Sequence, residues 1–200
     1  MNVLVKNMIM LLLGIAFMLS ACQSSEPSFR GTELGDYVGN VDFTLTDQHA
    51  ESFTLSDQKG KVVLMFFGFT YCPDVCPATL SRWRKVQEAL GEDAEQVEFV
   101  YITVDPERDT PEKMREHLAI FSPDFIGLTG TSEELLKVYS AYGIYREKEQ
   151  ISDSATGYLI NHTARIYVVD PEGNSRLSFR NDAPVEDIVH DVRLLLDRTT

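Results

Sequence analysis

The stretch that decides the fold is KVVLMFFGFTYCPDVCP, which runs from Lys61 to Pro77. Its first nine residues are almost continuously apolar, and such a run is typical of a strand buried on both faces of a sheet. Two cysteines, Cys72 and Cys76, follow at once, and each is followed by a proline. A helical stripe of apolar residues comes next and ends at Gly91. We therefore expect a buried strand, a cysteine-bearing turn and a long helix, in that order.

The rest of the chain alternates between strand and helix patterns. Further elements are expected as strands at 97–104 and 125–128, helices after the N-caps Thr110 and Thr131, a hairpin over 163–179, and an amphipathic helix over 185–196. Residues 41–55 form two short alternating runs around a turn, which predicts an N-terminal β-hairpin. Residues 144–161 have no clear period, and we expect an ordered loop there.

These patterns predict an α/β, thioredoxin-like fold with an added N-terminal β-hairpin. A strand, a helix and a second strand form a βαβ unit, and a hairpin with a closing helix completes the sheet. Right-handed crossovers would join the parallel strands, and helices would cover both faces. In such a fold the first parallel strand ends at the active site.

The first 22 residues have the layout of a bacterial export signal. Lys6 precedes an apolar run that ends in LSAC, at Cys22, and this run is shorter than the about 20 residues that cross a bilayer comfortably. LSAC resembles the lipobox, in which the cysteine becomes the lipidated first residue of the mature protein. An ordinary signal peptide that happens to contain a cysteine is the alternative.

This layout predicts three regions and a compartment. They are a lipoprotein signal peptide at 1–21, the lipidated Cys22 with a flexible tether at 22–39, and a single working domain at 40–200. The working domain would be extracytoplasmic and held at the membrane by the lipid on Cys22. Disulfides are permitted in that compartment.

Composition and charge exclude other classes of protein. With 44% hydrophobic and 10% aromatic residues, the chain has the composition of a packed globular protein. Its formal charge is −13, and without the first 21 residues it carries 17 basic against 31 acidic side chains, a net charge of −14. Such a surface repels phosphate backbones, so we expect no nucleic-acid partner.

The cysteine pair has three interpretations, namely a structural disulfide, a redox couple or two arms of a metal site. A disulfide between Cys72 and Cys76 would close a very short loop, and would remove far less chain entropy than the roughly 3 kcal/mol expected for fifteen residues. Pro77 suits the first position of a helix and should keep Cys76 out of α geometry, which places the thiols at a helix N-terminus. The N–H groups there lower a cysteine pKa, so redox and metal chemistry both remain open.

The number of available ligands limits which metal the cysteine pair could bind. A structural zinc site usually has four nitrogen or sulfur ligands in two pairs, and an iron–sulfur cluster commonly has four cysteines. This chain has no second cysteine pair. Two thiolates and one imidazole make a three-coordinate site, which copper accepts. Of the four histidines, His49, His117 and His190 fit ordinary surface or boundary roles. His162 stands just before a predicted strand, in a loop that a thioredoxin arrangement brings to the cysteines, so His162 is the candidate third ligand.

Three motifs occur in order along the chain: FGFTYCPDVCP from Phe67 to Pro77, VDPERDTPEKM from Val104 to Met114, and YLINHTARIYVVDPEG from Tyr158 to Gly173. Together they resemble the Sco (SenC) family of copper-delivery proteins of cytochrome c oxidase assembly. The resemblance implies a copper site made by Cys72, Cys76 and His162, which takes one copper per chain as Cu(I) or Cu(II). Many members use a transmembrane anchor, whereas this chain resembles a bacterial lipoprotein member. Either anchor would leave the domain on the same side of the membrane.

The resemblance implies a metallochaperone that delivers copper to the binuclear copper site of cytochrome c oxidase. Its partners would be the copper-binding subunit of the oxidase, a copper donor and a thiol reductant. Because the thiolates are ligands, a disulfide between Cys72 and Cys76 would abolish the site and couple copper loading to redox state.

Two further functions are weighed against this one. A thiol–disulfide oxidoreductase could keep the copper-site cysteines of the oxidase reduced, although CxxxC replaces CxxC and this function gives His162 no role as a ligand. A peroxidase related to peroxiredoxins would need an isolated peroxidatic cysteine with its own activating neighbours. Whether the protein is an enzyme as well as a metal carrier is left open by the sequence.

Two acidic residues, Asp105 and Asp109, follow the second predicted parallel strand, at the same edge of the sheet as the cysteines. Carboxylates in such a place can orient metal ligands or tune the charge around them. A capped and solvated loop leading into the next helix is the alternative. We expect neither aspartate to be a ligand.

Overall fold

The computed structural model describes residues 28–35, 38–39, 41–150 and 157–198. The predicted signal peptide at 1–21 and the predicted lipidation at Cys22 lie outside these residues. Within the described part of the chain, no helix is long and apolar enough to cross a membrane.

The centre of the described structure is an eight-stranded mixed sheet, with strand order β1-β10-β9-β4-β5-β6-β2-β3. Its strands are β1 (Thr32–Glu33), β2 (Thr44–Asp47), β3 (Ser52–Thr54), β4 (Val62–Gly68), β5 (Val97–Thr103), β6 (Ile126–Thr129), β9 (Arg165–Val169) and β10 (Ser175–Arg180). Strands β4, β5 and β6 are parallel, and β9 lies antiparallel to β4 on its other side. All seven residues of β4 are buried, as its continuous apolar run predicts.

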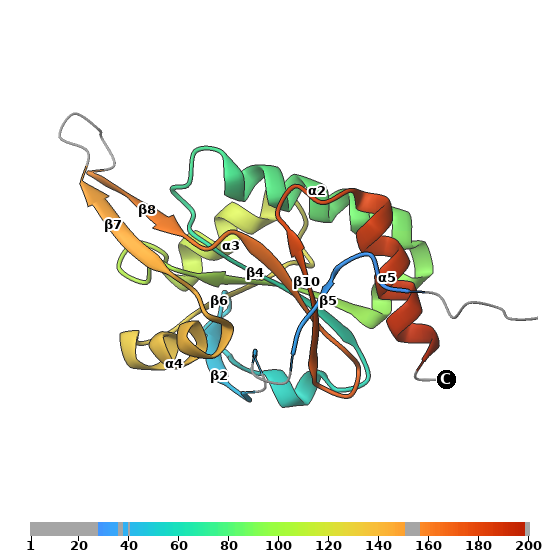
Figure 1. Ribbon diagram of the computed structural model, residues 1–200. Coiled ribbons are helices and arrows are strands. Elements are labelled where there is room, and N and C mark those ends of the chain that lie inside the picture. The colour runs from blue at the N-terminus through green and yellow to red at the C-terminus, as the bar shows by residue number, and fades with distance from the viewer. Residues whose placement is uncertain (1–27, 36–37, 40, 151–156, 199–200) are drawn as a thin grey trace, which may run out of the picture.

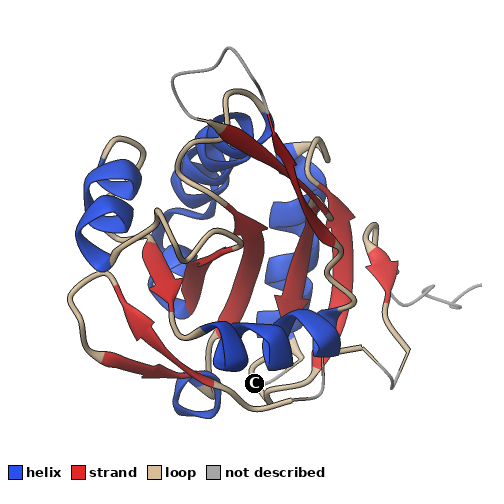
Figure 2. Cartoon of the chain, turned by 90° about the vertical axis from the view of Figure 1, so that its left-hand side faces the viewer, coloured by secondary structure: helices blue, strands red, loops and turns tan. Residues whose placement is uncertain are grey.

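Helices cover both faces of this sheet (Figure 2). They are α2 (Val75–Leu90), α3 (Pro111–Ala119), α4 (Ser132–Tyr142) and α5 (Val185–Asp197), with 3₁₀ turns at η2 (Leu55–Gln58) and η3 (Gly91–Gln96). The alternation of side chains along β4 separates the two layers. Phe66 packs edge-on against Trp83 of α2, whereas Phe67 packs edge-on against Tyr139 of α4. The predicted α/β, thioredoxin-like fold is confirmed.

The predicted N-terminal hairpin is also confirmed, and it extends the main sheet. Strands β2 and β3 pair antiparallel, and β2 also pairs with β6 through Thr46 and Thr129. Asp47 holds the turn, because its carboxylate accepts hydrogen bonds from the backbone N–H groups of His49 and Glu51. His49 is exposed in that turn.

The predicted ordered loop at 144–161 is wrong, because this segment contains two strands. β7 (Arg146–Gln150) and β8 (Tyr158–His162) pair antiparallel with each other and form a separate two-stranded sheet. β7 reads REKEQ, and none of its side chains is fully buried. An apolar alternation marks a strand only where one face is buried, so the sequence of β7 carries no such signal. The hairpin projects beyond the end of the main sheet (Figure 1).

The predicted boundary at residue 40 also requires correction. Residues 32–33 form the edge strand β1 on β10, so part of the predicted tether at 22–39 belongs to the folded domain. The backbone N–H groups of Arg30 and Gly31 donate to the fully buried carboxylate of Asp191 on α5, at 2.8–3.0 Å. A two-residue strand is too short to show a period in the sequence.

These contacts predict that replacing two aspartates of α5, which both contact Arg30, will lower the free energy of unfolding by different amounts. Asp191→Ala leaves the N–H groups of Arg30 and Gly31 without their acceptor, so we expect the free energy of unfolding to fall by about 1–3 kcal/mol. Asp187→Ala removes only an ion pair whose arginine is 46% exposed, so the loss should stay below about 1 kcal/mol. Urea unfolding of the two variants measures both values, and equal losses would contradict this assignment.

Candidate metal and redox site

The cysteine motif occupies the turn between the end of β4 and the start of α2. The backbone N–H of Cys72 donates to the carbonyl of Phe69 at 3.2 Å, which closes the turn. The helix begins at Val75, so Cys76 is already helical and Pro77 is its third residue. The prediction that Pro77 takes the first helical position and keeps Cys76 out of α geometry is therefore wrong. A proline is tolerated there because the first N–H groups of a helix have no partner within it.

The two thiols lie in different environments. Cys76 is fully buried, whereas Cys72 is half-buried, and both are free thiols. The backbone N–H of Cys76 points at the sulfur of Cys72, with a distance of 3.4 Å between the nitrogen and Sγ. The Cys76 side chain, followed by backbone N–H groups of residues 74–76, lowers the pKa of Cys72 to about 6. The neighbouring Cys72 and burial raise the pKa of Cys76.

His162 lies at the end of β8 and faces the inner cysteine. Its Nε2 is 4.0 Å from Sγ of Cys76, although 86 residues separate the two in sequence. Its Nδ1 lies 3.0 Å from the carbonyl oxygen of Thr163, so Nδ1 carries the proton and Nε2 presents its lone pair to the sulfur. The rings of Phe66 and Phe69 contact the imidazole edge-on, at centroid distances of 6.2 and 5.9 Å. Burial lowers the pKa of His162, which favours the neutral, ligating form.

The spacing of this pair fits ligation of one ion. Thiolate and imidazole bonds to Zn²⁺ are about 2.3 and 2.0 Å long, so two such ligands on one ion lie roughly 3.5–4 Å apart. The separation of 4.0 Å between Cys76 and His162 is at the upper end of that span. Among the described residues, however, no three His, Cys, Asp or Glu side chains already converge around one point as a metal site requires. The three side chains would therefore have to move closer together to bind one ion.

Asp109 attaches the cysteine turn to the neighbouring strand. It is fully buried, and its carboxylate accepts hydrogen bonds from the backbone N–H and the hydroxyl of Thr70, and from the hydroxyl of Thr103 at the end of β5. Burial raises the pKa of Asp109. The solvated-loop interpretation is thus wrong for this residue, which fixes the chain two residues before Cys72.

Asp105 attaches the histidine-bearing hairpin to the same loop. It too is fully buried, and it accepts a hydrogen bond of 2.8 Å from the hydroxyl of Tyr158 on β8 and an ion-paired hydrogen bond from Nε of Arg108. Burial, followed by the bond to Asp105, raises the pKa of Tyr158 to about 12. Neither Tyr158 nor Arg108 was predicted as a site residue from the sequence. Their position inside two of the three quoted motifs is the one signal that could have indicated them.

The other histidines have local partners. His190 lies 2.8 Å from the carboxylate of Asp191, at the far end of the domain. His117 of α3 packs against the rings of Tyr101 and Phe121. The boundary roles expected of both are consistent with these contacts.

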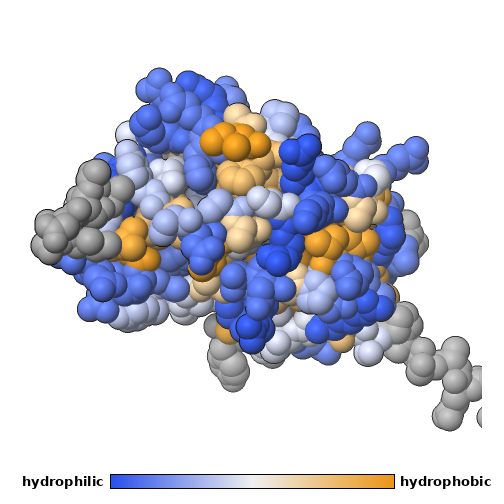
Figure 3. Space-filling model, turned by 90° about the horizontal axis from the view of Figure 1, so that it is seen from above, coloured by the Kyte–Doolittle hydropathy of each residue, from blue (hydrophilic) through white to orange (hydrophobic). Residues whose placement is uncertain are grey.

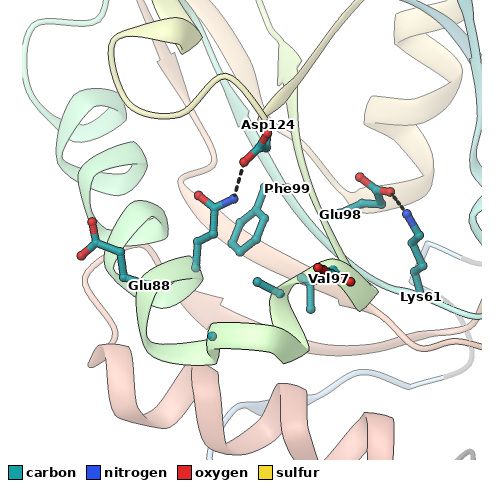
Figure 4. Close-up of a pocket in the computed structure, with 10 residues that line it drawn as sticks. Lys61, Glu88, Val97, Glu98, Phe99 and Asp124 are labelled. Carbon is teal, nitrogen blue, oxygen red and sulfur yellow. Dashed lines mark hydrogen bonds and ion pairs between the residues drawn. The ribbon is translucent and has the colours of Figure 1, made fainter.

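A surface pocket of about 510 Å³ lies at the opposite edge of the sheet, where β4 and β5 begin (Figure 4). Lys61 at its rim is ion-paired with Glu98 at 2.5 Å, and Asp124 accepts a hydrogen bond from Gln87. Four of its polar side chains thus bind one another in two pairs. The surface seen from above is mainly hydrophilic, and its apolar patches are separate (Figure 3), so the candidate site is identified by its chemistry and not by a deep cavity.

The chain is similar to known proteins of one family. The SCO1/SenC family model matches residues 32–197. The SCO2-like protein of Rickettsia felis is 33% identical over 187 residues, which are 90% of this chain and 91% of that protein. The structure of Bradyrhizobium japonicum ScoI with copper bound superimposes with a TM-score of 0.72 at 39% identity, over 79% of this chain and 99% of that one.

A further structure carries the same family name. The SCO1/SenC family lipoprotein from Bacillus anthracis superimposes with a TM-score of 0.69 at 28% identity, over 84% of this chain and 99% of that one. The family model and the Rickettsia relative each span most of the sequence. This protein therefore belongs to the SCO1/SenC family.

Proposed function

We propose that the protein is a copper metallochaperone in which Cys72, Cys76 and His162 bind one copper ion. The observation that carries the proposal is the approach of the His162 imidazole to the buried sulfur of Cys76, at 4.0 Å and with the unprotonated nitrogen facing it. Two soft thiolates and one imidazole suit copper, as Cu(I) or Cu(II), and leave it with few ligands. Copper bound to the Bradyrhizobium relative supports the choice of metal.

The recipient follows from the family, which acts in cytochrome c oxidase assembly. We infer that copper passes by ligand exchange to the binuclear copper site of the copper-binding subunit of the oxidase. A copper donor loads the protein, and a thiol reductant keeps Cys72 and Cys76 reduced. Oxidation of this pair to a disulfide releases two electrons and two protons to an oxidant and removes both sulfur ligands, so redox state controls loading.

A thiol–disulfide oxidoreductase that keeps the oxidase cysteines reduced is the second candidate. The difference between the two thiols favours it, because a half-buried thiolate can attack a target disulfide and a buried thiol next to it can then resolve the mixed disulfide. Cys72 has the lowered pKa and the partial exposure of the attacking thiolate, and Cys76 has the burial of the resolving thiol. This reaction gives His162 no role as a ligand, so we place it second.

We further propose that lipid on Cys22 anchors the domain on the extracytoplasmic side of the membrane. The lipobox-like LSAC supports the proposal, and so does the Bacillus anthracis relative that is described as a lipoprotein. Residues 1–21 would then be removed as the signal peptide. The domain begins near residue 30 in the structure, so the tether would be shorter than the sequence predicts.

His162→Ala tests the metal site directly. We expect the variant, as the full chain in detergent, to bind Cu(I) at least tenfold more weakly, because it loses the nitrogen ligand, while Cys72 and Cys76 still form a disulfide. His49→Ala is the matched control, since His49 is exposed in the β2–β3 turn. Competition with a Cu(I) chelator measures the affinities. Equal affinity in His162→Ala and the parent would remove His162 from the site and favour the oxidoreductase.

The reactivity of Cys72 is a second expectation, for the metal-free reduced protein. Because the thiolate is the nucleophile and the pKa of Cys72 is about 6, its alkylation rate should rise with pH and reach half its maximum near pH 6. Cys76→Ala removes the largest cause of that shift, so the midpoint should move to higher pH. Iodoacetamide labelling followed by mass spectrometry measures both, with the unfolded chain as reference. A midpoint above pH 8 in the folded parent would contradict the assignment.

A further inference from the structure

The candidate ligand His162 stands on a hairpin that is not part of the main sheet. β7 and β8 pair only with each other among the described strands, and they project beyond the end of the sheet (Figure 1). The cysteines, in contrast, follow β4 at the centre of the sheet. The distance between the imidazole and the sulfurs therefore depends on what attaches the hairpin to the rest of the domain.

Arg108 is at the centre of that attachment. Its Nη1 donates to the backbone carbonyl of Tyr158 on β8 at 3.1 Å, and its Nε donates to the buried carboxylate of Asp105. The guanidinium carbon also lies 3.6 Å from the centroid of the Tyr158 ring, while the hydroxyl of Tyr158 donates to the other oxygen of Asp105. Asp105, Arg108 and Tyr158 thus form a closed set of contacts between the β5–α3 loop and β8.

The same guanidinium reaches the cysteine turn. Its central carbon lies 4.7 Å from the ring centroid of Tyr71, the residue before Cys72, and 6.0 Å from that of Phe69. Phe69 in turn packs edge-on against the imidazole of His162. One side chain, 16% exposed, therefore contacts both the segment that carries the cysteines and the strand that carries the histidine.

Two other side chains also connect the hairpin to the β5–α3 loop, through Glu107 and the carbonyl of Val104. Lys148 of β7 pairs with Glu107, whose side chain is 67% exposed, and such a pair contributes little. Nε of Arg146 donates to the carbonyl of Val104 at 2.8 Å and holds the start of β7. Neither contact sets the position of β8 relative to Cys72.

We propose that Arg108 is a positioning residue for His162, which fixes the β7–β8 hairpin against the cysteine turn through Asp105, Tyr158 and Tyr71. The proposal rests on the proposed function for the role of His162, and it adds a residue that does not contact the ion. Arginine is required because its planar fork donates in two directions while its face stacks on a ring. A lysine would keep only the charge.

The first test uses metal-free, reduced full chain, so it does not depend on copper. In Arg108→Ala, we expect the backbone amides of residues 146–150 and 157–162 to exchange with deuterium at least tenfold faster, because the hairpin loses its attachment. Arg108→Lys should lie between this variant and the parent. Tyr158→Phe keeps the ring and removes only the bond to Asp105, so it should show a smaller increase.

The matched control is Arg193→Ala. Arg193 also joins two segments, because it donates to Asp93 and to the carbonyl of Ala89, but it lies on α5 at the other end of the domain. Its loss should leave exchange in the hairpin unchanged. Unchanged exchange in Arg108→Ala, or the same increase in Arg193→Ala, would overturn the proposal. If Arg108→Ala does not fold, Arg108→Lys and Tyr158→Phe decide by the same criterion.

The second test is a double-mutant cycle with Cu(I) as the probe. Arg108→Ala should weaken binding about 10–100-fold in the parent and should have no further effect in His162→Ala, because Arg108 acts through that imidazole. X-ray absorption should show a matching loss of nitrogen scattering. An equal loss of affinity in both backgrounds would show that Arg108 acts on the cysteines, and would overturn the proposal. If His162→Ala alone has no effect, the proposed copper site fails instead, and the exchange result still decides the attachment.

Discussion

The antiparallel pairing of β9 with β4 is the constraint on which the site depends. β4 runs toward the cysteine turn, and β9 starts from the same edge, so that Phe66 of β4 lies opposite Ile166 of β9. The residues that precede β9 must therefore lie beside the residues that follow β4. This register brings His162 next to Cys76 across 86 residues of sequence. Because β4 is buried between two layers of aromatic side chains, a shift by one residue would exchange Phe66 with Phe67, and the core prevents it.

The second consequence of this arrangement is the difference between the two cysteines. The helix α2 starts directly after the turn, so its first N–H groups are directed at the outer sulfur, while the inner sulfur lies under the helix in the core. A half-buried thiol whose pKa is lowered and a buried thiol whose pKa is raised are thus held side by side. The same pair is suited to bind a soft metal and to exchange disulfides, which is why these two functions are hard to separate on chemical grounds. The imidazole distinguishes them, because only metal binding uses it as a ligand.

Much of the fold could be predicted from the sequence, because buried elements have marked patterns. The apolar run before Cys72 predicted β4, and the position of His162 before a strand predicted its approach to the cysteines. The strand β7 was not predictable in this way, since its five residues are all polar or charged and show no apolar alternation. The burial of Asp105 was not predictable either, because DPERDT is hydrophilic. Its burial is stabilised by Arg108 and Tyr158, and Tyr158 lies 53 residues away.

In the proposed copper site, the β5–α3 loop contacts both segments that carry the ligands, and it holds them in different ways. Asp109, which is fully buried, fixes the cysteine turn through Thr70 and Thr103. The contacts of Asp105 and Arg108 reach the hairpin, which has no strand pairing with the main sheet. The proposed sulfur ligands therefore follow a central strand, whereas the proposed nitrogen ligand lies at the end of that hairpin, with two residues between it and β9. In the proposed transfer one ligand must leave first, and the ligand on the less firmly attached segment would do so. The attachment of the hairpin would then set how readily the imidazole leaves, while the thiolates would keep the ion until new ligands arrive.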